Sequence, residues 1–488
     1  MQNAKIHGRS VRQEEIMKKI TAAILSVLTA GALMFSLAGC TFFVPGASDE
    51  EPGKDDPVIE EPGKDPEEPG TEDPDISDDI GGSAWMDWED IFTGGSTEAY
   101  RLYQEAKADG FEGTFVDFLK EVGYNVNVDS SYAVGTAVQS VVAINCVFDE
   151  YLTSPPLPGA EPEQHTYSGA GVIYELDKEE GDAVIITNYH VVYEAGSVGD
   201  ETIPHISDDI RVYLYGEYYL DQYIEAEYVG GAMDYDIAVI RIEGSERLKN
   251  SAARAVTAAD SDQAVVGETV YAIGNPDSQG VSATRGIISV TSEYIDILAA
   301  DNKRTLNLLE MRVDAPINHG NSGGGLFNID GKLLGIVNAR SEASGVVDFG
   351  YAIPVNLAVS VAQNILDNAK SNDSKGAYRA TLGVTVQVDA RTSIYDEETG
   401  SSHVVEKISV QEVTEGTPAA GQLEVGDMIT GIRIEDGMEK TVTHLHTVTT
   451  FMFNVRKGDT VIISYERDGA AAEARITYDK DEMFTLFA

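Results

Sequence analysis

Short apolar runs recur at close spacing through the middle of the chain, from about Ser131 to Ser360. Gly, Pro, Asn and Asp separate them. Runs of this kind between turn-forming residues are typical of β strands, and their close spacing favours an antiparallel barrel. The clearest runs are Arg211 to Tyr215, Ile237 to Ile242, Thr269 to Ile273, Leu306 to Val313 and Leu333 to Asn338. The pattern predicts a mainly β fold with a double β-barrel.

Two stretches follow a helical period instead. Residues 355 to 370 end the β-rich region, and the short polar segment 371 to 376 reads as a hinge. Residues 96 to 122 read as two short amphipathic helices around a glycine-containing break. We therefore expect residues 83 to 130 to form a small helical module, with the role of a spacer.

The amino terminus carries an apolar run, Ile20 to Leu37, behind Lys18 and Lys19. The run ends in Leu37-Ala38-Gly39-Cys40, which resembles the site at which a bacterial lipoprotein signal is cut and its cysteine lipidated. Residues 1 to 39 are thus predicted to be a signal peptide, and Cys40 to anchor the protein on the extracytoplasmic face of the bacterial cell membrane. An uncleaved transmembrane helix remains the alternative. We expect translation to start at Met17 rather than at Met1, because Glu14 and Glu15 are unusual in a signal peptide whereas Met17-Lys18-Lys19 would begin a conventional one.

Charge is strongly negative, with a formal net charge of -48 over 488 residues. Part of the excess lies in residues 49 to 79, where Glu-Pro-Gly-Lys-Asp begins at Glu51 and again at Glu61. Such a segment buries too little apolar surface to fold, so residues 40 to 82 are predicted to be a disordered tether. The remaining acidity argues against nucleic acid as a partner.

Only two cysteines occur. With Cys40 assigned to lipidation, Cys146 has no partner and no intramolecular disulfide is expected. Because Cys146 lies in the apolar run Val141 to Val147, it is expected to be a small buried residue rather than a reactive thiol.

Three polar residues stand at strand ends in the chain order His190, Asp236, Ser322. A serine hydroxyl is a weak nucleophile unless a histidine takes its proton and a carboxylate orients that histidine. Each residue alone also fits a structural role, as a strand-end histidine, the start of a strand or a loop serine. Their joint occurrence favours a catalytic triad.

Glycines surround the serine in Gly320-Asn321-Ser322-Gly323-Gly324. They allow a tight turn in which the N–H groups of Gly320 and Ser322 converge on the oxyanion of a tetrahedral intermediate. The sequence therefore predicts an oxyanion hole in the same segment as the nucleophile, with neither a metal nor a cofactor.

These segments resemble the HtrA (DegP and DegS) family of trypsin-like serine proteases. Further similar segments are Ser168 to Ile173, Ala272 to Pro276, Thr284 to Ser289, Val313 to Asn318 and Gly350 to Pro354. The resemblance covers residues 131 to 370, which it implies are a trypsin-like protease domain. Two residues depart from the family pattern. Gly325 replaces the usual proline and is expected to loosen the serine loop, whereas His319 is expected to face solvent, with pH sensing or substrate contact as the alternative.

Residues 377 to 488 resemble a PDZ domain. Leu382-Gly383-Val384-Thr385 resembles its carboxylate-binding loop, residues 415 to 420 its short helix, and residues 444 to 453 the helix that lines the peptide groove. The resemblance implies that Leu382, Gly383 and Val384 bind a peptide C-terminus while the peptide adds a strand to the sheet.

Together these resemblances imply a membrane-anchored serine endopeptidase that degrades or processes unfolded or misfolded proteins in protein quality control and the stress response. Pro316 and the segment Tyr351-Ala352 suggest an apolar or small side chain before the cut. A homotrimer is the family's habit. Two alternatives from other classes are a chaperone or scaffold with an idle triad, and a surface-binding protein that does not hydrolyse its partner.

Overall fold

A computed structural model describes residues 130–488 except 152–159, 199–203, 219–221, 339–348, 373 and 397–400, together with residues 106, 107 and 111. The predicted signal peptide, Cys40, the acidic tether and nearly all of the helical module lie outside these residues. The chain divides into two compact units, Met1–Asn127 and Val128–Ala488, and the described strands all belong to the second. Among the helices that the structure describes, none has both the length and the apolar character to cross a membrane.

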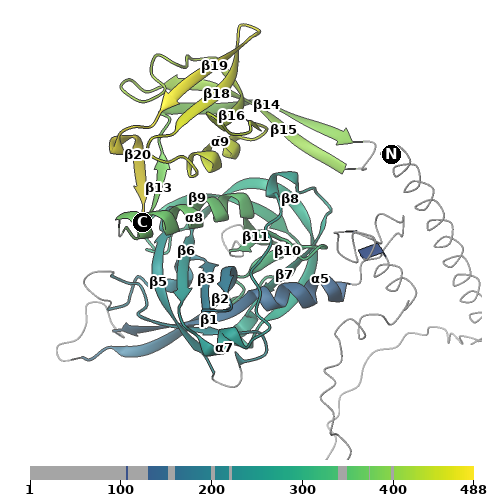
Figure 1. Ribbon diagram of the computed structural model, residues 1–488, viewed down its shortest axis with the longest axis vertical. Coiled ribbons are helices and arrows are strands. Elements are labelled where there is room, and N and C mark those ends of the chain that lie inside the picture. Colours follow the sequence, from purple (N-terminus) through teal and green to yellow (C-terminus); the bar gives the residue numbers. More distant parts are fainter. Residues whose placement is uncertain are drawn as a thin grey trace, which may run out of the picture. The chain divides into compact units, whose positions relative to one another are not determined.

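The first barrel is a closed sheet of six strands in the order β1-β2-β3-β6-β5-β4 (Figure 1). Alternate side chains of its strands point inward and form an apolar core that contains Ile144, Ile185 and Ile240. Cys146 lies in this core, fully buried, as the sequence predicted. Burial raises the pKa of its thiol well above the ordinary value. The strands are β1 (Val141–Glu150), β2 (Glu163–Asp177), β3 (Asp182–Thr187), β4 (Asp209–Tyr213), β5 (Ile224–Ala232) and β6 (Ile237–Ile242).

The second barrel is also a closed sheet of six strands, in the order β10-β11-β12-β9-β8-β7. Its own core contains Val270, Met311 and Leu326. Each strand predicted from the apolar runs overlaps an observed one, and the double-barrel prediction is confirmed. The strands are β7 (Thr269–Gly274), β8 (Ser282–Leu298), β9 (Thr305–Val313), β10 (Gly325–Asn328), β11 (Leu333–Val337) and β12 (Gly350–Pro354).

A further apolar cluster joins the barrels to α8 (Val355–Asn372). Ile186 and Phe327 from the two barrels share it with Ile365 of the helix. The predicted helix at 355 to 370 is therefore confirmed, and its apolar face closes the space beside the barrels. Shorter helices are α5 (Ser130–Ala137), α6 (Tyr189–Val192), α7 (Glu246–Lys249) and the 3-10 turns η1 (Val138–Ser140), η3 (Met233–Tyr235), η4 (Ser261–Gln263), η5 (Pro276–Ser278) and η6 (Asp481–Met483).

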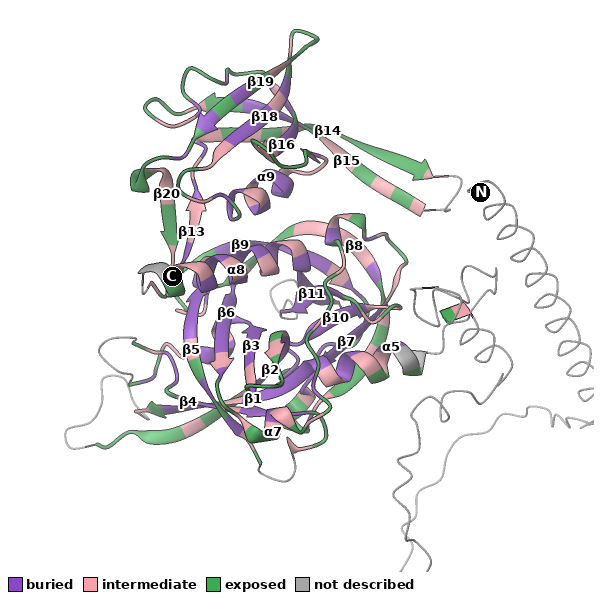
Figure 2. Cartoon of the chain, in the orientation of Figure 1, coloured by how far each residue is buried: buried purple, intermediate pink, exposed green. Residues whose placement is uncertain are grey.

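The carboxy-terminal region is a second fold built on one sheet in the order β14-β15-β16-β18-β19, with β17 paired to β16. The edge strand β14 forms a long hairpin with β15, and the outer part of that hairpin is exposed or half-buried (Figure 2). Strands β13 and β20 pair separately. The elements are β13 (Ala377–Ala380), β14 (Val384–Asp396), β15 (Ser401–Val413), β16 (Met428–Ile434), β17 (Lys440–Thr441), α9 (Leu445–Met452), β18 (Thr460–Arg467), β19 (Ala470–Thr477) and β20 (Phe484–Phe487).

Helix α9 confirms the prediction of a helix at 444 to 453, whereas the short helix predicted at 415 to 420 is wrong. That segment makes separate turns closed by hydrogen bonds from Thr417 N to Thr414 O and from Ala420 N to Thr417 O. Gly416 has a positive φ of 80°, and Pro418 has no N–H, so a continuous helix cannot form.

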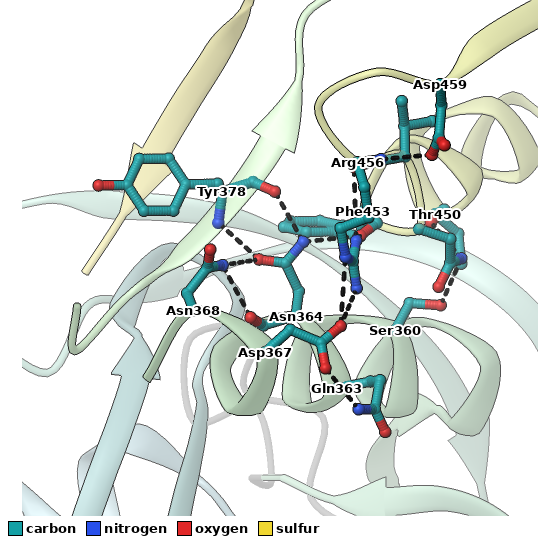
Figure 3. A network of polar contacts seen from close by, with 12 residues as sticks. Ser360, Gln363, Asn364, Asp367, Asn368, Tyr378, Thr450, Phe453, Arg456 and Asp459 are labelled. Carbon is teal, nitrogen blue, oxygen red and sulfur yellow. Dashed lines mark hydrogen bonds and ion pairs between the residues drawn. The ribbon is translucent and has the colours of Figure 1, made fainter. Parts of the chain in front are cut away.

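Polar contacts bind α8 to the carboxy-terminal region (Figure 3). The buried Asn364 donates from Nδ2 to the carbonyls of Tyr378 at 2.8 Å and Phe453 at 2.7 Å, and its Oδ1 accepts from Tyr378 N at 2.7 Å. Asp367 accepts from Nη2 of Arg456 at 2.6 Å. One amide side chain thus fixes two main-chain segments of the carboxy-terminal region to the helix that follows the barrels.

Candidate active site

His190 and Asp236 are brought together by the first barrel. His190 lies on α6, just after β3, and Asp236 directly follows η3, just before β6, which pairs with β3. Asp236 Oδ2 lies 2.7 Å from His190 Nδ1, and Asp236 Oδ1 accepts from the His190 main-chain N–H at 3.0 Å. The carboxylate therefore holds both the backbone and the ring of the histidine, which leaves Nε2 as the free ring nitrogen.

The environment of His190 favours its protonated form. Burial opposes the charge, but the carboxylate of Asp236 and its hydrogen bond outweigh burial and raise the pKa of His190 above the ordinary value. An imidazolium formed during a reaction is stabilised by the same contact.

Asn188 supports this pair, and the sequence reading did not single it out. It is fully buried, and its Nδ2 donates to the Asp236 carbonyl at 2.9 Å, which also accepts from Tyr189 N at 3.2 Å. A polar residue between a buried strand and the candidate histidine is the signal that could have found it.

Ser322 lies in a tight loop before β10. Gly320 has φ of 91°, and a Cβ there would lie 2.1 Å from the Asn275 carbonyl oxygen, so only glycine fits. Within the described part of the chain, the N–H groups of Gly320 and Ser322 have no hydrogen-bond acceptor. Both amides are therefore available to an oxyanion.

Strand β2 connects the histidine side of the site to the serine loop. The Thr187 hydroxyl, at the end of β3, donates to the Ala170 carbonyl at 2.7 Å, and Ala170 N donates to the Ser322 carbonyl at 2.8 Å. A Cβ built on the neighbouring Gly169 would lie 2.7 Å from Val191 and 3.2 Å from the Ser322 carbonyl oxygen. Glycine at 169 lets α6 and the serine loop approach each other.

Gly325 does not loosen the serine loop, so that prediction is wrong. The residue is buried in β10, where it pairs with Ile336 of β11 and Ile273 of β7. A Cβ at this position would lie 2.3 Å from the ring of Phe327. Pairing on both sides removes the backbone freedom that glycine would have in a loop, and the glycine makes room for an aromatic ring. His319 is exposed, as expected.

The Ser322 hydroxyl donates to the Asn338 carbonyl at 2.6 Å, and no hydrogen bond joins it to the His190 ring, both residues being among those described. Asn338 directly follows β11, and its Nδ2 donates to Oε1 of the fully buried Glu310 at 2.6 Å. Burial, with the nearby charge of Asp236, raises the pKa of Glu310 well above the ordinary value despite this hydrogen bond. Glu310 was missed in the sequence, although a lone acid within the apolar strand β9 was a signal.

The residues expected to bind a peptide C-terminus lie where β14 begins. Leu382 packs in the core of the carboxy-terminal region, and Val384 is the first residue of the edge strand. Gly383 has φ of 81°, and a Cβ there would lie 2.1 Å from Thr417. Its N–H has no acceptor among the described residues. Cys40, the predicted lipidation site, lies outside the residues that the structure describes.

Two closed barrels with a histidine–carboxylate pair and a glycine-framed serine define the class of trypsin-like serine endopeptidases. A family model of the trypsin-like peptidase domain matches residues 169–336, and a PDZ model matches residues 380–477. The chain belongs to the HtrA family of serine proteases. It is a serine endopeptidase with a carboxy-terminal PDZ domain.

Known proteases are similar to this chain over much of its length. The chain is 31% identical over 377 residues to the serine protease Do-like HtrA of Lactococcus lactis subsp. lactis (strain IL1403), covering 73% of this chain and 84% of the relative. It is 28% identical over 330 residues to the periplasmic pH-dependent serine endoprotease DegQ of Escherichia coli (strain K12), covering 66% of this chain and 62% of the relative. A solved structure of the HtrA-type protease AlgW with decapeptide shares 26% identity and a TM-score of 0.44, covering 74% of this chain and 99% of that one.

Proposed function

We propose that His190, Asp236 and Ser322 are the catalytic triad of this endopeptidase, and that the N–H groups of Gly320 and Ser322 form its oxyanion hole. The observation that carries the proposal is the double hold of Asp236 on His190, at 2.7 Å to the ring and 3.0 Å to the backbone. A carboxylate in this position selects the tautomer with the proton on Nδ1 and leaves Nε2 to act as the base.

Acylation begins with rotation of the Ser322 hydroxyl from the Asn338 carbonyl toward His190. The serine oxygen bonds to the scissile carbonyl carbon while its proton passes to His190 Nε2. The electron pair of the carbonyl moves to its oxygen, which accepts hydrogen bonds from the two amides. His190 then gives the proton to the amine nitrogen as the carbon–nitrogen bond breaks.

Water completes the turnover. His190 takes a proton from the water as the water oxygen bonds to the acyl carbon, and the tetrahedral intermediate collapses with release of the Ser322 oxygen, which regains the proton. Replacing Ser322 by Ala should abolish cleavage of an unfolded protein such as casein. Cleavage at the wild-type rate by that variant would refute the assignment.

Unfolded or misfolded proteins are the substrates that we propose. We assign Leu382, Gly383 and Val384 to the binding of peptide C-termini, since within the described residues the Gly383 N–H has no acceptor and β14 is an edge strand. Titration of a fluorescent peptide with a free carboxylate should saturate the domain, and its C-terminal amide should bind much more weakly. Equal affinity for the two peptides would contradict this assignment.

Anchoring through lipidated Cys40 on the extracytoplasmic face of the cell membrane is also part of the proposal. It rests on the sequence of residues 18 to 40 and on relatives that are named periplasmic endoproteases. Mass spectrometry of the mature amino terminus tests it, because a lipidated Cys40 should be the first residue. We further propose a homotrimer, which light scattering of the detergent-solubilised protein would test.

A chaperone or scaffold with an idle triad is the second candidate. The hydrogen bond from Ser322 to Asn338 favours it, because a serine held in this way does not share its proton with His190. A protein of this kind would suppress aggregation of an unfolded client and would leave the client uncleaved. Following aggregation and cleavage in the same sample distinguishes the two functions.

A further inference from the structure

Tyr235, which directly precedes Asp236, packs into an aromatic cluster contributed by the carboxy-terminal region. Its ring centroid lies 4.8 Å from that of Phe453 and 5.2 Å from that of Phe487, both in edge-on geometry. Arg379 completes the cluster. Its guanidinium lies 4.8 Å from the Phe487 ring centroid, and its Nη1 donates to the Tyr235 hydroxyl. We call Arg379, Phe453 and Phe487 the Tyr235 clamp.

The clamp is anchored independently of Tyr235. Arg379 lies on β13 and Phe487 on β20, and these strands pair from Ala377 with Phe487 to Ala380 with Phe484. Phe453 is fully buried, and its carbonyl accepts from Asn364 of α8 at 2.7 Å (Figure 3). The three residues are therefore held by contacts of their own and pack against the tyrosine ring from outside the barrels.

Tyr235 and Asp236 belong to one tight turn. Asp236 N donates to the Met233 carbonyl at 3.1 Å, and Asp236 has φ of 51°, in the left-handed region. A residue other than glycine keeps such a conformation only where its surroundings hold it. On the other side of the turn, Asp234 is paired with Arg304 at 2.8 Å. The two residues before Asp236 are thus both tethered to other parts of the protein.

We infer that the Tyr235 clamp positions Asp236 and that the carboxy-terminal strand β20 acts through Phe487 as a positioning element of the protease. The inference rests on the proposed role of Asp236 in orienting His190. A turn that loses the clamp rotates the Asp236 carboxylate away from the imidazole, and small displacements of catalytic groups cost large factors in rate.

Phe487→Ala is the direct test, with Leu486→Ala as its matched control, because Leu486 is the adjacent residue of β20 and is 48% exposed. Activity is measured on a small chromogenic peptide, and the rate is divided by the concentration of sites that a fluorophosphonate titrates. We expect Phe487→Ala to lower kcat by about ten- to a hundredfold with KM unchanged. The acidic limb of its pH–rate profile should move to lower pH, because a displaced Asp236 stabilises the His190 imidazolium less and the pKa of His190 falls. Leu486→Ala should match the wild type.

Phe487→Leu and Tyr235→Phe cover the case in which Phe487→Ala fails to fold. Leucine keeps apolar volume but loses the ring contacts, whereas phenylalanine at 235 keeps the ring and loses only the hydrogen bond from Arg379, so Phe487→Leu should be the slower of the two. An unchanged kcat in Phe487→Ala or Phe487→Leu would overturn the inference. The inference would also be overturned if the total activity of the variant fell only in proportion to its number of titratable sites, while the acidic limb of its pH–rate profile stayed in place. Neither result touches the proposed triad, which is tested separately by cleavage of substrate by Ser322→Ala.

Discussion

The hydroxyl of Ser322 donates to the main-chain carbonyl of Asn338 at 2.6 Å. In this arrangement the proton of the proposed nucleophile points to the backbone rather than to His190. Asp236 already holds the imidazole, and the two loop amides lack acceptors in the described part of the chain. The Ser322 hydroxyl must therefore leave the Asn338 carbonyl before His190 can take its proton.

Glu310 stands behind that contact. It accepts from the Asn338 side chain at 2.6 Å, while its Oε2 and the Asn338 Oδ1 are buried without a partner among the described residues. A carboxyl group in this setting is favoured in its neutral form, which can donate a hydrogen bond as well as accept one. Asn338, whose carbonyl accepts the Ser322 proton, is thus hydrogen-bonded through its side chain to a buried acid that the chemistry of a triad does not require.

Replacing Asp236 by Asn should lower kcat by about 10³- to 10⁴-fold, because an amide neither stabilises the imidazolium nor selects the productive tautomer. The pKa of His190, now raised by Asp236, should fall, and the acidic limb of the pH–rate profile should move to lower pH. Asp209→Asn, at a partly exposed carboxylate paired with Arg211, is the control. An acidic limb that stays in place in Asp236→Asn would show that His190 is not the titrating base.

Replacing Gly320 by Ala should lower kcat by about 10²- to 10³-fold, because the new Cβ would lie 2.1 Å from the Asn275 carbonyl oxygen and displace the oxyanion donors. Gly267→Ala is a matched control. Gly267 has a similar φ of 88°, but nothing lies within 4 Å of its built Cβ among the described residues. Both variants bear the strain of a left-handed alanine, and only the first should lose turnover. Equal kcat values for the two variants would argue against the assigned oxyanion hole.

Replacing Glu310 by Gln should stabilise the protein at neutral and alkaline pH. The pKa of Glu310 is raised on folding, so the folded state keeps a proton that the unfolded chain releases. The stabilisation that Glu310 gives the folded protein is complete below the pKa that this residue has in the unfolded chain. It is lost as pH rises through the pKa of the folded state. Between these two pKa values, the free energy of unfolding falls by about 1.4 kcal/mol for each pH unit.

Thermal unfolding at several pH values measures this effect. Wild type and Glu310→Gln should unfold at similar temperatures near pH 4, and the variant should have the higher Tm at pH 8. Glu412→Gln, at an exposed position of β15, controls for a general change of charge. A variant whose Tm falls further below that of the wild type as pH rises would mean that the carboxylate form of Glu310 is the stabilising one.

The triad candidates could be read from the sequence because each one sits beside a strand whose apolar residues are unmistakable. His190 follows the strand that ends at Thr187, Asp236 precedes Ile237, and glycines mark the loop of Ser322. Closure of a barrel restricts where its strand ends can lie. Local pattern and chain order were therefore enough to assign these residues to one candidate site.

Long-range contacts could not be read in this way. The direction of the Ser322 hydroxyl depends on a carbonyl that follows β11. The lone acid of β9, Glu310, stands out in the sequence, but its full burial depends on the strands that close the barrel around it. The prediction for Gly325 was wrong because a glycine after a loop suggests a flexible backbone. In the structure, strand pairing fixes its backbone and the ring of Phe327 fills the space beside it. The contact of Tyr235 with Phe487 joins residues that no sequence period connects.

Reaction with a fluorophosphonate probe is the most direct measurement of the central claim, that Ser322 is a nucleophile activated by His190. The probe forms a bond to a serine oxygen only when a base accepts the proton of that oxygen. The wild-type protein should be labelled at one site, which peptide mass spectrometry should locate at Ser322. Ser322→Ala should not react, and His190→Ala should react slower by several orders of magnitude. A wild-type protein that resists the probe, or a Ser322→Ala variant labelled at the wild-type rate, would contradict the proposed triad.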